Sequence, residues 1–195
     1  MASLSGFTAA AEPGPVLRAG HACSPQTGCV SLNFEGTTNN DWLVIRESDA
    51  APFIWNASDR SGIVALRGCL QRTGTKVRCY RQRSKSIYID LYGGDDQVRV
   101  GSVLRTNEVS GGPGRDALVG GTGRDFGLSG GSGRDQLRGR KGKDAYYGGE
   151  GNDLLSAAND DTDLEINCGP GRDKAVIDAQ DPVPKSCERI VVRSR

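Results

Sequence analysis

Histidine, methionine and aromatic residues are scarce in this sequence of 195 residues. It contains one histidine, one methionine and 6% aromatic residues. A Ser-His-Asp triad would depend on His21, beside Cys23 near the start of the chain, and histidine-based metal sites are nearly excluded. No run of about 18 apolar residues is present, so no membrane-spanning helix is expected. The net charge of +1 gives no overall attraction to nucleic acid or to an anionic membrane.

Residues 1–22 are expected to be a leader or a disordered tail. Residues 1–11 lack a basic start, yet Ala9, Ala10 and Ala11 are typical of the end of a secretory signal. The Glu-Pro-Gly-Pro segment at 12–15 fits a disordered leader equally well. The sequence leaves both interpretations open.

Glycine, in contrast, is abundant, and it recurs together with aspartate. Five aspartates follow one another at spacings of nine, ten, nine and nine residues, and each closes a glycine-rich turn of six residues. They are Asp116, Asp125, Asp135, Asp144 and Asp153. A large apolar residue follows in step, namely Leu118, Leu128, Leu137, Tyr146 and Leu155. Two residue types that share one period predict a structural repeat, whereas a flexible linker would not keep them in register.

The chemistry of the turns points to a hard cation. Each unit is predicted to be a short strand and a tight turn, so that two units make one coil of a flattened solenoid. Glycine permits positive φ, which turns carbonyl oxygens toward the gap between stacked turns, and the aspartate adds a charged oxygen. Calcium takes about 6–8 oxygen ligands, more than one turn supplies. An ion would therefore lie between same-side turns, which predicts three aspartate pairs: Asp116 with Asp135, Asp135 with Asp153, and Asp125 with Asp144. The glycines predicted to shape these sites are Gly112, Gly114, Gly121, Gly123, Gly131, Gly133, Gly149 and Gly151.

Residues 111–155 resemble the hemolysin-type (RTX) calcium-binding repeats, whose nonapeptide is G-G-x-G-x-D-x-U-x. The resemblance rests on GGPGRD, GGTGRD, GGSGRD, GRKGKD and GGEGND. It implies a right-handed parallel β-roll with Ca²⁺ between its turns. Arg140 replaces the second glycine of the fourth unit, which makes that turn the weakest candidate. Residues 111–155 hold six acidic and seven basic residues, so modest calcium affinity is expected, and a solenoid that no longer holds metal is the alternative.

Shortened or isolated copies of the turn flank the repeats. Asp96 precedes Asp116 by twenty residues, and Asp173 follows Asp153 by twenty, so both are candidates for additional metal sites. The segment 168–195 resembles the cysteine-bracketed ending of secreted actinobacterial calcium-binding repeat proteins, and is expected to cap the solenoid. The acidic stretch between these regions contains Asp160, Asp161, Asp163 and Glu165. It matches no EF-hand spacing, so a solvated acidic loop is expected there.

The six cysteines fall into three close pairs. They are Cys23 with Cys29, Cys69 with Cys79, and Cys168 with Cys187. An even number with local pairing predicts disulfides and an oxidising compartment, although six cysteines allow fifteen connectivities. A zinc site is a poor alternative because no Cys-x-x-Cys is present. Calcium agrees with a secreted, extracellular protein, where the ion is abundant.

Residues 23–92 are expected to be short strands between turns, because no helical period is evident and residues 87–92 alternate between apolar and polar. The domain prediction is a strand region at 23–92, repeats at 93–167 and a cap at 168–195. The strand region also carries a basic cluster, formed by Arg72, Lys76, Arg78, Arg81, Arg83 and Lys85. A solvated hairpin face is favoured there over contact with a polyanion.

The sequence thus predicts an all-β protein: a right-handed parallel β-roll with a short N-terminal strand region and a disulfide-bracketed cap. The predicted function is that of a secreted calcium-binding module with a structural or adhesion role and without enzymatic activity. A cell-surface or polyanionic partner is predicted, and no specific nucleic acid. Two alternatives stay open: the secretion or substrate-binding tail of an extracellular enzyme, and a metal-independent solenoid that binds a polyanion through its basic cluster.

Overall fold

A computed structural model describes residues 17–24, 28–48, 51–58, 63–65, 69–73, 76–80, 86–101 and 108–194, with side chains at 33–46, 87–101 and 108–194. All regular elements in these ranges are β-strands, and they form a β-solenoid of stacked parallel strands. The predicted all-β roll is therefore confirmed. A leader or disordered tail was predicted for residues 1–22, and residues 1–16 of it lie outside the described residues. None of the described residues forms a helix that is long and apolar enough to cross a membrane.

The strands belong to two sheets. The first sheet contains β1 (Leu17–Ser24), β2 (Gly28–Thr37), β5 (Ile63–Ala65), β8 (Ser86–Tyr92), β10 (Glu108–Gly114), β12 (Leu128–Gly133), β14 (Ala145–Gly151) and β16 (Glu165–Asn167). The second sheet contains β3 (Trp42–Ser48), β4 (Ala51–Ser58), β6 (Cys69–Thr73), β7 (Lys76–Tyr80), β9 (Gln97–Val100), β11 (Ala117–Val119), β13 (Gln136–Arg138), β15 (Leu154–Ser156), β17 (Lys174–Asp178) and β18 (Arg189–Arg193).

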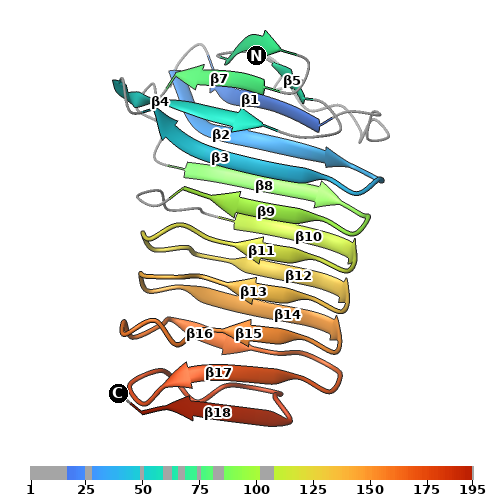
Figure 1. The fold of residues 1–195 in the computed structure, drawn as a ribbon, viewed down its shortest axis with the longest axis vertical. Coiled ribbons are helices and arrows are strands. Elements are labelled where there is room, and N and C mark those ends of the chain that lie inside the picture. Colours follow the sequence, from blue (N-terminus) through green and yellow to red (C-terminus); the bar gives the residue numbers. More distant parts are fainter. Residues whose placement is uncertain are drawn as a thin grey trace, which may run out of the picture.

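Each coil of the solenoid contributes one strand to each sheet. The chain passes from β10 to β11, returns to β12, crosses to β13, and repeats this path to β17. The first sheet has the order β16-β14-β12-β10-β8-β2-β1-β5, and the second the order β18-β17-β15-β13-β11-β9-β3-β4-β7-β6. The strands are stacked along the long axis of the molecule, with β18 at one end (Figure 1). Turns of the same side therefore lie directly above one another.

The core lies between the two sheets and is built from the apolar residues that follow the turns. Leu118, Leu137 and Leu155 are paired in register on the second sheet, and Leu128 pairs with Tyr146 on the first. All five are exposed by 1% or less. Their predicted inward orientation is confirmed. A single coil cannot bury these side chains alone, so they become buried only when coils stack.

Strands near the start of the chain join the solenoid. β2 pairs in parallel with β8, and β3 pairs in parallel with β9, so these two strands form a coil of their own. The antiparallel strands β4, β7 and β6 then extend the second sheet beyond β3. The solenoid therefore begins before residue 93, and an insertion separates its first coil from the next.

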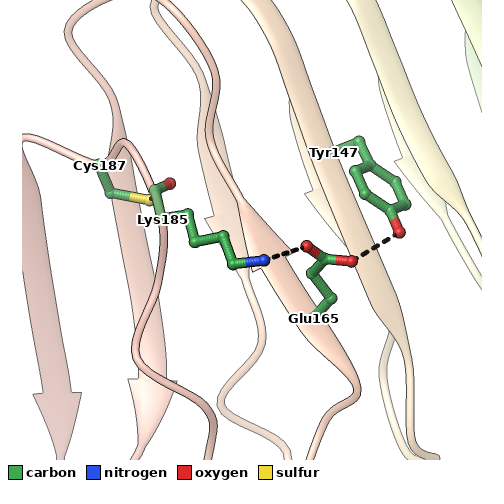
Figure 2. Close-up of polar contacts among 4 residues, drawn as sticks. All are labelled: Tyr147, Glu165, Lys185 and Cys187. Carbon is green, nitrogen blue, oxygen red and sulfur yellow. Dashed lines mark hydrogen bonds and ion pairs between the residues drawn. The ribbon is translucent and has the colours of Figure 1, made fainter.

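The C-terminal end is closed by a disulfide and a parallel edge strand. Cys168 and Cys187 are bonded, with their Cα atoms 5.2 Å apart, which confirms one of the three predicted pairings. β18 pairs with β17 in the final position of the second sheet. On the outer face, Lys185 Nζ lies 2.7 Å from Glu165 Oε1, and the Tyr147 hydroxyl donates to Glu165 Oε2 at 3.0 Å (Figure 2). These contacts attach residues 185–187 to β14 and β16.

Candidate metal centres

The turns lie along two edges of the solenoid. First-edge turns lead from the first sheet to the second, and second-edge turns lead back. The first-edge turns are residues 36–41, 93–96, 111–116, 130–135, 148–153 and 168–173. The second-edge turns are residues 120–125, 139–144 and 158–163.

Glycine is required in the first-edge turns because the backbones of successive turns approach closely. Gly131 has φ +113°, and a Cβ there would overlap the carbonyl oxygen of Gly112, its equivalent in the preceding turn. The predicted glycines with positive φ are Gly112, Gly114, Gly131, Gly133, Gly149 and Gly151. Gly121 and Gly123, in the second-edge turn at 120–125, do not have positive φ. The turn at 120–125 therefore differs in backbone conformation from the first-edge turns.

On the first edge, the aspartates form a continuous ladder of side chain to backbone hydrogen bonds. The amide of Asp116 donates to Asp135 Oδ1, and that of Asp135 donates to Asp153 Oδ1, both at 2.8 Å. The same bond recurs from Asp41 to Asp96, from Asp96 to Asp116, from Asp153 to Asp173, and from Asp173 to Glu188 Oε2. We call this series the first ladder. It contains the predicted pairs Asp116 with Asp135 and Asp135 with Asp153, together with Asp96 and Asp173.

A shorter second ladder runs along the second edge. The amide of Asp125 donates to Asp144 Oδ1 at 2.8 Å, the amide of Asp144 to Asp163 Oδ1 at 2.9 Å, and the amide of Asp163 to Asp181 Oδ1 at 3.0 Å. The predicted pair Asp125 with Asp144 is therefore adjacent. Apart from Asp41 and Asp125, which start the ladders, each ladder carboxylate uses one oxygen to accept from the amide of the preceding ladder residue.

The other oxygen of most ladder aspartates has no hydrogen-bond partner. The buried and unpartnered atoms are the Oδ2 atoms of Asp96, Asp116, Asp135, Asp144, Asp153, Asp163 and Asp173. These side chains are exposed by 5% or less. A buried oxygen of this kind costs free energy unless it binds a donor or a cation. Stacked rows of such oxygens are therefore candidate cation ligands.

Burial raises the pKa values of six ladder carboxyls well above the ordinary value of 3.8, namely those of Asp96, Asp116, Asp135, Asp144, Asp153 and Asp163. Asp144 reaches about 8, because burial outweighs the hydrogen bond from the Asp125 amide and the neighbouring carboxylates add to the rise. Asp96 reaches about 7, and Asp116 reaches about 6 for the same leading cause. Burial thus shifts the balance toward the neutral acid, whereas a bound cation would favour the carboxylate.

The space beside each unpartnered oxygen suits a calcium ion. A Cβ on Gly111 would overlap Asp116 Oδ2 and lie 2.7 Å from the carbonyl oxygen of Gly130, in the next first-edge turn. A Cβ on Gly130 would likewise overlap Asp135 Oδ2 and lie 2.6 Å from the carbonyl oxygen of Gly148. A carboxylate oxygen and a carbonyl oxygen from neighbouring turns thus converge where glycine leaves room. This all-oxygen donor set fits Ca²⁺.

Backbone carbonyls have to provide most of the ligands. Within the described residues, no group of three or more His, Cys, Asp or Glu side chains is placed to hold a metal ion together. The aspartates are spread along the ladders, with one oxygen of each engaged by a backbone amide. Each gap therefore combines few carboxylates with carbonyl oxygens, an arrangement that calcium accepts.

Two second-edge turns depart from the pattern. At Asp125, Oδ2 accepts a hydrogen bond of 3.0 Å from the Gly121 amide, so this oxygen is already engaged. In the next turn, Arg140 occupies the position of the missing glycine and has φ +78°, a conformation that L-residues rarely adopt. Arg140 and Gly142 (φ +122°) thus repeat the positive-φ pattern of the first-edge turns, and the weaker calcium binding expected of this turn stays a prediction.

The expected solvated acidic loop at residues 160–165 is wrong for Asp163. This side chain is only 5% exposed, and it occupies the next position of the second ladder after Asp144. The sequence contained a signal, since Asp163 follows Asp144 by nineteen residues, the distance between same-side turns. The absence of glycine from residues 158–163 concealed it.

Three other ladder members were missed, and two of them end the ladders. Asp41 starts the first ladder, and its carboxylate accepts from the Thr37 amide at 2.7 Å and the Thr37 hydroxyl at 3.3 Å. Asp181 ends the second ladder, with Asp163 and Asp178 donating to its two oxygens. Glu188 follows Asp173 in the first ladder. The carboxylates of Asp41 and Asp181 accept hydrogen bonds from donors in their own or neighbouring turns. These bonds engage both oxygens of each carboxylate, whereas most of the other ladder aspartates leave one oxygen for a cation.

The remaining predicted sites involve side chains outside the described part. Backbone register places Cys23 opposite Cys29 and Cys69 opposite Cys79, while the side chains of both pairs lie outside the described residues. The same holds for the basic cluster at 72–85. These disulfides and the cluster stay predictions.

Comparison with known protein families supports the identity of the repeats. The model of the RTX calcium-binding nonapeptide repeat (4 copies) matches residues 106–126 and 128–155. This part includes the aspartates from Asp116 to Asp153, while Asp41, Asp96, Asp163 and Asp173 lie outside it. No curated protein and no solved structure matches the chain.

Proposed function

We propose that this protein is a non-catalytic calcium-binding β-roll that works outside the cell in a structural or adhesive role. The observation that carries the proposal is the row of buried, unpartnered aspartate oxygens along each edge of the solenoid. The match of residues 106–126 and 128–155 to calcium-binding repeats supports the choice of ion.

Calcium would supply positive charge to gaps in which carboxylates otherwise face one another. The side chains of Asp116, Asp135 and Asp153 on the first edge, and of Asp144 on the second, would hold the ions with carbonyl oxygens of the glycine turns. Binding would then be linked to folding, because the stacked oxygens exist together only in the folded chain. The protein would be less stable without calcium and fully ordered at extracellular calcium concentrations.

Secretion is supported by the Cys168–Cys187 disulfide, since such bonds persist in oxidising compartments. Extracellular modules bind calcium at about 10⁻⁴–10⁻³ M, and the modest affinity expected from the near-neutral charge of residues 111–155 agrees with that range. A solenoid whose stacked coils depend on calcium would serve as a spacer or an adhesion element on a cell surface.

Thermal melts followed by circular dichroism test the function. The intact, disulfide-bonded protein is compared in excess chelator and in millimolar calcium. We expect calcium to raise the melting temperature, and the Asp116→Asn/Asp135→Asn variant to lose much of that rise. Asp90→Asn is the matched control, because Asp90 is exposed on β8 and belongs to neither ladder. Identical melts of the wild-type protein in both conditions would disprove calcium-dependent stability.

A further inference from the structure

The apolar stack of the first sheet is interrupted by one hydroxyl group. Tyr146 occupies the inward position that Leu128 fills in the preceding coil, and it is fully buried. Its hydroxyl oxygen has no hydrogen-bond partner. A buried hydroxyl left in this state costs free energy that a leucine at the same position would avoid. The hydroxyl therefore needs an explanation that packing does not supply.

The Tyr146 hydroxyl reaches across the core to the second edge. It lies against Gly139, the first residue of the turn closed by Asp144, where a Cβ would overlap both the hydroxyl and Asp144 Oδ2. The first glycine of the other turns has different neighbours. It lies beside the aspartate oxygen of its own turn and a carbonyl oxygen of the next turn on the same edge, as seen at 111–116, 120–125, 130–135 and 148–153. In the turn at 139–144, the phenol oxygen takes that place.

A second buried oxygen belongs to the same region. Asp163 follows Asp144 in the second ladder, and its Oδ2 is also unpartnered. Burial raises the pKa of the Tyr146 hydroxyl most, and the nearby carboxylates of Asp163 and Asp144 add to the rise. A phenol oxygen can bind a cation as a neutral donor, as water and carbonyl groups do. Asp163 lies outside the residues that match the repeat family.

We propose that the gap at the turn 139–144 is a cation site of distinct composition, in which the Tyr146 hydroxyl binds the ion together with Asp144 and Asp163. The inference rests on the proposed calcium function and adds a ligand that the repeat pattern does not provide. It also agrees with the absence of glycine from the next second-edge turn, 158–163, because an oxygen from the core takes the place of the carbonyl oxygen that the next turn supplies elsewhere.

Calcium titration by calorimetry of the full chain, wild type against Tyr146→Phe, tests the inference. We expect one class of sites to weaken at least about tenfold in the variant, while the remaining sites are unchanged. Tyr147→Phe is the matched control, because Tyr147 is adjacent in sequence but lies on the outer face, where it donates to Glu165. Terbium luminescence excited through tyrosine should fall in Tyr146→Phe and persist in Tyr147→Phe.

Thermal melts separate a ligand from a structural residue. In chelator, Tyr146→Phe should melt at the same temperature as the wild type or higher, because an unpaired buried hydroxyl has been removed. In saturating calcium, it should melt lower. Superimposable calcium titrations of wild type and Tyr146→Phe would overturn the inference and leave the calcium function intact. A wild-type chain that binds no calcium would overturn both.

Discussion

At the scale of single residues, backbone conformation decides which side chains the turns accept. Arg140 has φ +78° where other turns of the roll use glycine, and its guanidinium donates to the carbonyl oxygen of Val100 at 3.3 Å. A left-handed conformation costs an L-residue roughly 1–2 kcal/mol, whereas glycine adopts it freely. The turn therefore keeps a strained arginine whose only described hydrogen bond is long.

Replacing Arg140 should reveal this strain. Arg140→Gly and Arg140→Ala both remove the guanidinium, but only glycine relieves the backbone. We expect Arg140→Gly to be more stable than Arg140→Ala by about 1 kcal/mol, since part of the relief is offset by the entropy of glycine in the unfolded chain. Urea unfolding in chelator measures the difference. Equal stability of the two variants would show that the turn is not strained at this position.

At the scale of elements, the ladders join like charges that the fold holds close together. Burial raises the pKa of Asp144 to about 8, of Asp96 to about 7 and of Asp135 to about 6, against 3.8 for an ordinary aspartate. Each carboxyl therefore binds its proton more tightly in the folded chain than in the unfolded chain. The resulting stability is fully present below about pH 4 and is lost as the pH rises through 6 to 8.

Acid should partly replace calcium. We expect the melting temperature of the calcium-free protein to rise as the pH falls from 8 to 5, and the stabilisation by calcium to be larger at pH 8 than at pH 5. Differential scanning calorimetry across this range gives both quantities. Asp144→Asn should flatten the dependence in the calcium-free protein. A calcium-free melting temperature that falls toward pH 5 would contradict the buried, proton-binding ladder.

The disulfide of the cap is expected to contribute far more than the ion pair beside it. Cys168 and Cys187 are separated by 19 residues, and closing a loop of this size stabilises a protein by about 3 kcal/mol. Lys185 is 67% exposed and Glu165 is 33% exposed, and pairs this open to solvent contribute little. In urea unfolding, Cys168→Ser/Cys187→Ser should lose about 3 kcal/mol, and Lys185→Ala should resemble the wild type. The reverse ranking would show that the cap is held by its outer-face contacts.

At the scale of the whole molecule, the solenoid is a stack in which each coil contacts only its neighbours. Asp135 lies inside the first ladder, between the turns of Asp116 and Asp153. Asp173 lies near its end and is followed only by Glu188. A carboxylate inside the stack has a ladder aspartate in the turn on each side, so its loss affects two gaps between turns. A carboxylate near the end has a ladder aspartate on one side and the cap on the other, so its loss affects one such gap and the cap.

Position in the stack should therefore set the effect of a substitution. In saturating calcium, we expect Asp135→Asn to lower the melting temperature by about 4 °C, equivalent to roughly 1–2 kcal/mol, and Asp173→Asn to lower it by less. Both variants keep the oxygen that accepts the amide hydrogen bond, so the comparison isolates the charge. An equal or larger effect of Asp173→Asn would argue against cooperative stacking of the interior turns.

Sequence reasoning predicted the parts of the molecule that repeat. The period of aspartate and glycine predicts the stacked pairs Asp116 with Asp135 and Asp125 with Asp144, because each position has a local requirement that recurs in every coil. It did not predict Asp41, which joins the first ladder across 55 residues of sequence. The strands β4 to β7 lie within this interval and hide the period.

The sequence alone determined the coil of this protein. Positive φ at the turn glycines, inward leucines and a carboxylate in every unit are local requirements, and together they allow little except a parallel roll. Only the tertiary structure decided which groups besides the five repeat aspartates share its edges. Asp41, Asp163 and the Tyr146 hydroxyl reach the ladders because stacking brings same-edge turns together in space, regardless of their distance along the chain. Because these oxygens and those of the neighbouring ladder aspartates are buried, each needs a backbone amide, a bound proton or a cation as its partner.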